Sequence, residues 1–290
     1  MTWPFVTAAQ LADELSGAHP PFVFDASAVL HTPEFDGDYR RDSGYPRWVS
    51  AHIPGSRHVD VPSQFSDSDS RLHYTHPEPQ AIADELARLG VAAGDAVVTY
   101  DSTGSLWAAR LWYLLRWIGV EVRVLDGGLR AWTDAGLPTT DQPTDEVAAV
   151  ASWLADAVVD AWVTIDEVLA RGSDDARSLV CGLPAGSFLG TAPTRYARRG
   201  RIPNSVNVSS RDLFGSTGQV RAAAEIATAY ETAGVRIEPG SPEILLYCGG
   251  GISASASALT LAAVGVDAVR IYDGSLEEWA ANSALPLELG

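Results

Sequence analysis

Residues 244–279, ILLYCGGGISASASALTLAAVGVDAVRIYDGSLEEW, decide the fold, because an earlier stretch of the chain has the same order of features. Residues 97–132 read VVTYDSTGSLWAARLWYLLRWIGVEVRVLDGGLRAW. Each stretch has an apolar run ending in Tyr, a loop with glycine, a long helical pattern, Gly-Val, a second apolar run, Asp-Gly and a final Trp. Cys248 corresponds to Asp101 with an offset of 147 residues, and Asp273 corresponds to Asp126 with the same offset. A period this long indicates a duplicated domain.

Shorter motifs support the duplication and indicate the fold class. HIPGS at residues 52–56 corresponds to RIPNS at residues 201–205. Near-continuous apolar runs, such as FVFD and ILLY, are typical of strands that are buried on both faces of a parallel sheet. The segments between them have helical spacing. We therefore predict an α/β protein with a domain over residues 1–138, a linker over 139–152 and a second domain over 153–290.

The composition narrows the function classes. The 290 residues include 37 acidic and 20 basic ones, which gives a formal net charge of −17. Such a chain repels nucleic acid and anionic membranes, so we expect neither as a partner. The N-terminus does not resemble a signal peptide and no apolar run could span a bilayer, which predicts a cytoplasmic protein. An anionic substrate would need local basic groups or backbone N–H groups.

Cys248 is the candidate nucleophile. It follows the apolar run ILLY and precedes three glycines and a helical pattern, so it should lie where a strand leads into a helix. Ligands of open α/β sheets bind at such positions. Loop amides and the helix N-terminus would favour the thiolate and would also stabilise a persulfide anion. The alternative is a flexible turn with a buried, inert cysteine.

The duplicated halves, the HIPGS motif, the segment VLDGGLRAW and the loop CGGGIS together resemble the tandem-domain rhodanese family of thiosulfate and 3-mercaptopyruvate sulfurtransferases. The resemblance covers nearly the whole chain. It implies two rhodanese-like domains, each with a parallel five-stranded sheet flanked by helices. The first domain would be inactive, because Asp101 stands where the second domain has Cys248.

The resemblance also implies a ping-pong reaction. Cys248 would take sulfur from a small anionic donor, become a persulfide, and pass the sulfur to a thiol or cyanide acceptor. The amides of the loop would hold the persulfide, namely those of Gly249, Gly250, Gly251, Ile252 and Ser253. No cofactor and no metal are expected.

Two features depart from the family pattern. The family usually has arginines at the positions of Leu183 and Ser187, where they hold the carboxylate or sulfonate of the donor. Gly250 also lacks the hydroxyl that a serine there would offer to relay a proton. Basic residues of the segment TRYARRGR could bind the donor instead, namely Arg195, Arg198, Arg199 and Arg201. The alternative is a solvated, charged loop.

Three other hypotheses remain open. The resemblance implies that Cys181 ends a strand next to the strand before Cys248. It could then resolve the persulfide or form a protective disulfide, or it could simply pack as a small apolar residue. A phosphatase of this fold would need an arginine six positions after the cysteine, where this chain has Ala254. A non-catalytic or redox-responsive sulfur-carrier or binding module is the alternative to an enzyme.

Overall fold

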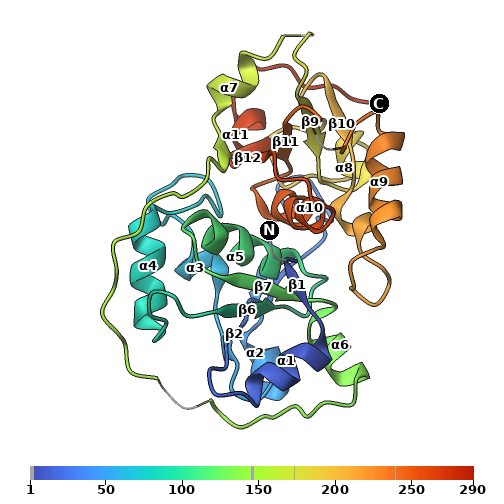
Figure 1. Ribbon diagram of the computed structural model, residues 1–290. Coiled ribbons are helices and arrows are strands. Elements are labelled where there is room, and N and C mark those ends of the chain that lie inside the picture. Colours follow the sequence, from blue (N-terminus) through green and yellow to red (C-terminus); the bar gives the residue numbers. More distant parts are fainter. Residues whose placement is uncertain (1–2, 145–146, 173, 239) are drawn as a thin grey trace.

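The protein contains two parallel five-stranded sheets with the same strand order, one in each half of the chain (Figure 1). The computed structural model describes residues 3–144, 147–172, 174–238 and 240–290. The predicted α/β fold of two parallel five-stranded sheets flanked by helices is confirmed.

The first sheet has the order β1–β7–β6–β2–β5 and the second has the order β10–β9–β11–β12–β8. The strands of the first are β1 (Phe5–Val6), β2 (Phe22–Asp25), β5 (Arg57–His58), β6 (Val97–Tyr100) and β7 (Val122–Leu125). Those of the second are β8 (Trp162–Val163), β9 (Ser178–Cys181), β10 (Ser205–Asn207), β11 (Ile244–Tyr247) and β12 (Val269–Tyr272). A short antiparallel pair, β3 (Ala28–Leu30) and β4 (Arg41–Ser43), accompanies the first sheet.

Helices connect these strands. The first half has α1 (Ala8–Leu15), α2 (Tyr45–Ser50), α3 (Val61–Gln64), α4 (Pro79–Arg88), α5 (Leu106–Trp117) and α6 (Gly128–Asp134). The second half has α7 (Ile165–Leu169), α8 (Ala185–Phe188), the 3₁₀ helix η1 (Ser210–Leu213), α9 (Ala223–Thr232), α10 (Ile252–Ala263) and α11 (Ser275–Ala281). No described helix is long and apolar enough to cross a bilayer.

The two halves share one hydrophobic core. Residues of α5 and α10 and of the sheet faces beneath them belong to a single buried cluster that extends through both halves. The outer face of each sheet has a smaller core of its own, formed with α1 and α6 in the first half and with α11 in the second. Helices α5 and α10 pack against each other where the halves meet, which Figure 1 shows at the centre of the molecule.

The repeated IPxS motif has the same structural task in both halves. The Tyr100 hydroxyl lies 2.9 Å from the Ser56 hydroxyl, and the Tyr247 hydroxyl lies 2.7 Å from that of Ser205. Each tyrosine ends the central strand of its sheet and is fully buried. A buried phenol needs a hydrogen-bonding partner, so the motif fixes the strand end from which the loop to α5 or α10 departs.

Charged groups tie the halves together. Arg110 of α5 is fully buried and donates to both carboxylate oxygens of Asp273, at 2.8 and 3.1 Å, and to Tyr74 O at 2.6 Å. Asp273 also accepts from the His76 backbone N–H at 2.7 Å. The repeat-related Asp126 accepts from the Val220 N–H of the other half at 2.8 Å. Both aspartates that the duplication pairs therefore bind the opposite half.

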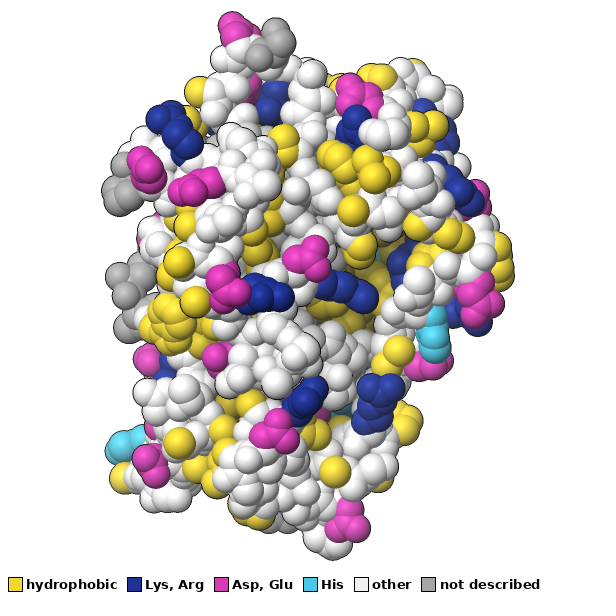
Figure 2. Space-filling model, turned by 90° about the vertical axis from the view of Figure 1, so that its right-hand side faces the viewer, with side chains coloured by type: hydrophobic (Ala, Val, Ile, Leu, Met, Phe, Trp, Pro, Cys, Tyr) yellow, Lys and Arg dark blue, Asp and Glu magenta, His cyan; other side chains and the backbone are white. Residues whose placement is uncertain are grey.

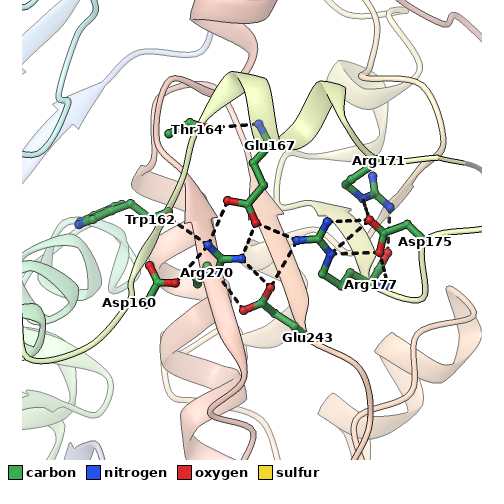
Figure 3. A network of polar contacts seen from close by, with 9 residues as sticks. All are labelled: Asp160, Trp162, Thr164, Glu167, Arg171, Asp175, Arg177, Glu243 and Arg270. Atoms are coloured by element: carbon green, nitrogen blue, oxygen red, sulfur yellow. Dashed lines mark hydrogen bonds and ion pairs between the residues drawn. The ribbon is translucent and has the colours of Figure 1, made fainter.

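Figure 3 shows a second charged network, which lies around the N-terminal ends of strands of the second sheet. Arg270 of β12 bonds to Glu167 and Glu243, and Arg177 bonds to Glu167 and Asp175. Glu243 immediately precedes β11, whereas Cys248 immediately follows it. These arginines are already paired with carboxylates and stand far along the strands from the thiol, so the network supports the fold rather than the site.

The segment after α6 follows the surface of the first half. Val150 N–H donates to Ala87 O at 2.9 Å, and Val158 N–H donates to Trp117 O at 2.9 Å. The described part of residues 141–160 contains neither helix nor strand. The predicted linker over 139–152 lies partly outside the described residues, and the domain boundaries stay a prediction.

Candidate active site

Cys248 lies directly after β11 and before α10, with only 2% of its surface exposed. Its backbone is held on both sides: its N–H donates to the Ser275 hydroxyl at 3.1 Å, and its carbonyl accepts from Leu276 N–H at 3.2 Å. Ser275 is fully buried and has a left-handed φ of 50°, which is strained for a residue other than glycine. The start of α11 therefore fixes the position of Cys248.

Each glycine of the loop has a steric reason. A Cβ at Gly249 would overlap the Tyr196 hydroxyl, and one at Gly251 would overlap both Arg110 and Asp273. Gly251 also has a φ of +79°, which favours glycine. A Cβ at Gly250 would lie 3.3 Å from His73 O. The loop is thus packed closely by both halves of the protein, and it is not a flexible turn.

The amides of this loop are free to bind a ligand. Among the described residues, no group accepts a hydrogen bond from the N–H of five successive residues: Gly249, Gly250, Gly251, Ile252 and Ser253. The last two open the 12-residue helix α10, where N–H groups have no intrahelical partner. Free amides and the positive end of a helix dipole favour an anion.

The first half shows what such a loop does with an anion. The Asp101 carboxylate, at the position that corresponds to Cys248, is buried and accepts four backbone N–H bonds of 2.8–3.0 Å. The donors are Thr103, Ser105, Trp107 and Ala108, around the start of α5. The same chain therefore contains a second copy of the loop with a negative group bound in it.

The two loops differ in length by one residue. Helix α5 starts after Ser105, which has a φ of +64°, and α10 starts after Gly251, which has a φ of +79°. Ala109 N–H donates to Ser105 O, and Ser255 N–H donates to Gly251 O, both at 3.0 Å. The helices are therefore related by 146 residues rather than by 147, so the Cys248 loop is the shorter one. The amide donors of Asp101 correspond to free N–H groups near Cys248.

Cys248 and Gly249 line a cavity of about 450 Å³ between the halves. Leu183 and Ser187 line it too, so arginines at these two positions would have reached it. The wall contains Arg195 and Arg211 but no Asp or Glu among its described residues, although the chain carries a net charge of −17. Acidic and basic side chains intermingle on the molecular face in Figure 2, so this cavity differs in charge from that surface.

The four candidate arginines do not share one position. Arg195 lines the cavity; one of its Nη atoms donates to His31 O, and its buried Nε has no partner in the described part of the chain. The other three lie outside the cavity wall and are held elsewhere. Arg198 donates to Ala280, Asn282 and Leu285 carbonyls, Arg199 pairs with Asp36, and Arg201 pairs with Glu288. The expectation that these three bind the donor is corrected, because their guanidinium groups cap the end of α11 or pair at the surface.

Cys181 faces away from the cavity. In the sheet register it pairs with Tyr247, and both belong to the core on the outer face, whereas Cys248 belongs to the shared inner core. Cys181 is fully buried, burial raises its pKa to about 12, and both cysteines are free. This arrangement fits the packing alternative and not the resolving thiol, because neighbouring strand ends need not direct two side chains to the same face.

Three residues of the site were not predicted. Tyr196 and Arg211 line the cavity, and Ser275 holds the Cys248 amide. The sequence could have pointed to two of them. Tyr196 stands inside the basic segment TRYARRGR, and Ser275 replaces Gly128 of the first half. At position 254, where the phosphatase hypothesis needs an arginine, the buried Ala254 is part of α10.

The rhodanese-like domain family matches residues 7–135 and 191–282 of this chain. The chain belongs to the rhodanese family. This rhodanese is 30% identical over 248 residues to the 3-mercaptopyruvate sulfurtransferase of Escherichia coli (strain K12), covering 83% of this chain and 84% of the relative. It is 29% identical over 231 residues to the thiosulfate sulfurtransferase of Gallus gallus, covering 79% and 78%.

The solved structures agree with this assignment. The crystal structure of SseA from Escherichia coli, a 3-mercaptopyruvate sulfotransferase with the rhodanese fold, matches with a TM-score of 0.79. The sequence identity is 27%, and the match covers 95% of this chain and 99% of the other. The relatives are thus named as sulfurtransferases, and their names include two different sulfur donors.

Proposed function

We propose that this rhodanese transfers a sulfane sulfur from an anionic donor, 3-mercaptopyruvate or thiosulfate, to a thiol or cyanide acceptor through a persulfide on Cys248. The observation that carries the proposal is the pair of matching loops. In the first half four amides bind the Asp101 carboxylate, and in the second half the corresponding amides surround a cysteine and have no acceptor among the described residues. A persulfide anion is the negative group that a cysteine at this position would form.

The charge of the cavity supports a small anionic donor. Arg195 and Arg211 bring guanidinium groups to a wall without described carboxylates, and no described residue pairs with the Arg211 side chain. Guanidinium groups bind carboxylate and sulfonate oxygens with paired hydrogen bonds. These two arginines would take the place of the arginines that the family has at Leu183 and Ser187.

The reaction follows from these positions. The Cys248 thiolate attacks the outer sulfur of the donor, an S–S bond forms, and the bond between this sulfur and the rest of the donor breaks with its electron pair on the leaving group. The amides stabilise the persulfide anion that results. An acceptor thiolate or cyanide then attacks the outer sulfur, and the electron pair of the S–S bond returns to Cys248 as thiolate. Because Cys248 is nearly buried, both substrates must enter through the same cavity, as a ping-pong scheme requires.

Mass spectrometry of the intact protein tests the proposal. Incubation with either donor should add one sulfur atom to Cys248, and dithiothreitol or cyanide should remove it. Cys248→Ser should gain no sulfur, whereas Cys181→Ala should gain it as the unaltered protein does. If neither donor adds sulfur, the proposed function is wrong, and a binding module that senses oxidation becomes the better explanation.

Steady-state kinetics test whether Arg195 and Arg211 bind the donor. Arg195→Gln and Arg211→Gln should raise KM for the preferred donor and should leave the dependence on the acceptor concentration unchanged. Arg199→Gln is the matched control, since Arg199 comes from the same segment but pairs with Asp36 at the surface. An equal effect of all three substitutions would argue against a donor-binding role for Arg195 and Arg211.

A cytoplasmic location also stays a prediction.

A further inference from the structure

The two donors leave different products, and only one of them needs a proton. Thiosulfate loses its outer sulfur and leaves sulfite, which is a stable anion. 3-Mercaptopyruvate loses its sulfur from a methylene carbon and leaves the enolate of pyruvate, which must take up a proton. An enzyme that uses the second donor gains from an acid beside the reacting sulfur, typically about 10²- to 10⁴-fold in rate.

The loop itself offers little acidity. Its first three residues after Cys248 are glycines, so only backbone amides are present there, and the first hydroxyl of the loop belongs to Ser253. The wall of the cavity contains no described Asp or Glu that could donate a proton. His31 also lines the cavity, but its Nε2 lies 2.7 Å from Asp42 Oδ2. Among the other groups of the wall, a phenol gives up its proton more readily than an aliphatic hydroxyl does. The acid should therefore be sought among the tyrosines of the cavity.

Tyr196 is the tyrosine that touches the loop. Its hydroxyl lies so close to Gly249, the residue after the thiol, that a Cβ there would overlap it. Tyr196 lines the cavity together with Cys248, and no described residue is a hydrogen-bonding partner of its hydroxyl. Burial, and next the nearby charge of Cys248, raise the Tyr196 pKa, so the phenol keeps its proton while the thiolate is present.

The other tyrosines of the cavity are engaged differently. Tyr39 stacks on His73 with ring centroids 4.0 Å apart, and Tyr74 packs edge-on against Trp107 at 5.2 Å. No glycine of the loop would meet the hydroxyl of Tyr39 or Tyr74 if it carried a Cβ. Because Gly249 has no side chain, the Tyr196 hydroxyl can lie against the loop directly after Cys248.

We propose that Tyr196 is a catalytic acid, which protonates the carbon leaving group when the donor is an α-keto thiol such as 3-mercaptopyruvate. The inference rests on the proposed sulfur transfer. The Cys248 thiolate attacks the donor sulfur, the C–S bond breaks, and its electron pair moves onto the methylene carbon and the adjacent carbonyl. The phenol gives its proton to this carbon, which completes pyruvate. The proton of the donor thiol, released from the new persulfide, restores the phenol.

Tyr196→Phe tests the inference, because it removes only a hydroxyl without a described partner. Single-turnover loading of Cys248 is followed by mass spectrometry with 3-mercaptopyruvate and with two donors whose leaving groups need no proton, thiosulfate and benzenethiosulfonate. We expect loading from 3-mercaptopyruvate to slow by about 100-fold or more. Loading from the other two donors should keep the rate of the unaltered protein, which also shows that the variant is folded.

Two further variants complete the test. Tyr230→Phe is the matched control, because it removes a buried hydroxyl from α9, outside the cavity, and should change the rate of loading from no donor. Ser253→Ala removes the loop's own hydroxyl. The inference is overturned if Tyr196→Phe slows all donors equally or none, or if Ser253→Ala alone shows the donor-selective loss. Unaltered protein that loads from thiosulfate but not from 3-mercaptopyruvate also overturns it and leaves the proposed function intact; loading from no donor refutes both.

Discussion

Replacement of Arg110 by methionine should lower the free energy of unfolding by about 3–5 kcal/mol, the range for a buried ion pair that loses one partner. The structure explains why the upper part of this range is expected. Arg110 is fully buried, and its side chain makes three hydrogen bonds, two to Asp273 and one to Tyr74 O. Methionine has a similar length, so the change removes the charge and the donors with little loss of volume. Among its described partners, Asp273 would keep the His76 N–H alone.

Urea unfolding measured by tryptophan fluorescence and by circular dichroism provides the assay. The pair joins α5 of the first half to the end of β12 in the second, so its loss should also separate one cooperative transition into two. Asp273→Leu should cost a similar amount. The double variant Arg110→Met/Asp273→Leu should be less destabilised than the sum of both, because it leaves no unpaired charge.

Two results would refute this reasoning. A loss below about 1 kcal/mol for Arg110→Met would place the pair in the range of exposed salt bridges, against its burial. Strict additivity in the double variant would show that the two groups do not depend on each other. Arg88→Met is the matched control, since the exposed Arg88 pairs with Glu85 within α4 and makes no described contact to the other half, so its loss should cost less than about 1 kcal/mol.

Three other predictions follow from single contacts. Gly249→Ala should nearly abolish persulfide loading by displacing Tyr196. Gly250→Ala should reduce loading much less, because its Cβ would meet His73 O at 3.3 Å, a tight contact that a shift of a few tenths of an ångström relieves. Loading assays on both variants decide. Cys181→Ala should leave turnover and sensitivity to peroxide unchanged, and a change in either would restore a redox role for this thiol. Arg177 lowers the pKa of Asp175 to about 2, so this carboxylate stabilises the fold above its ordinary pKa near 3.8, and the contribution is lost as the pH falls toward 2. Arg177→Gln should flatten this part of the pH profile of urea unfolding, whereas an unchanged slope would contradict the assignment.

The duplication and the place of the candidate nucleophile could be predicted from the sequence because they depend on local patterns. Apolar runs, helical spacing and the pairing of Cys248 with Asp101 identify two parallel sheets and the loop that follows β11. The sequence pattern also contained the offset of 146 residues between α5 and α10, in the Gly-Val pairs at 119–120 and 265–266, but the offset of 147 between the aspartates on either side concealed it. Hydrogen bonds such as that from Ala109 N–H to Ser105 O make this shift plain in the structure.

The sequence could not predict which arginines line the cavity, because long-range contacts decide which members of a cluster reach it. Arg195 and Arg198 are three residues apart, yet Arg198 caps the end of α11, more than 80 residues later in the chain, and Arg195 borders Cys248. Tyr196 was overlooked because its role depends on a glycine 53 positions away. Cys181 was placed at the correct strand end, but pairing with Tyr247 directs it to the outer face.

The Asp101 loop provides a spectroscopic reference inside the same molecule. Its four amide protons are hydrogen-bonded to a carboxylate at all times, so their NMR chemical shifts report how this type of loop responds to a bound anion. When Cys248 accepts a sulfur atom, the amide resonances at the start of α10 should move toward lower field, in the direction that those at the start of α5 already show. Titration with a donor could therefore be followed residue by residue against an unchanging standard that the chain supplies itself.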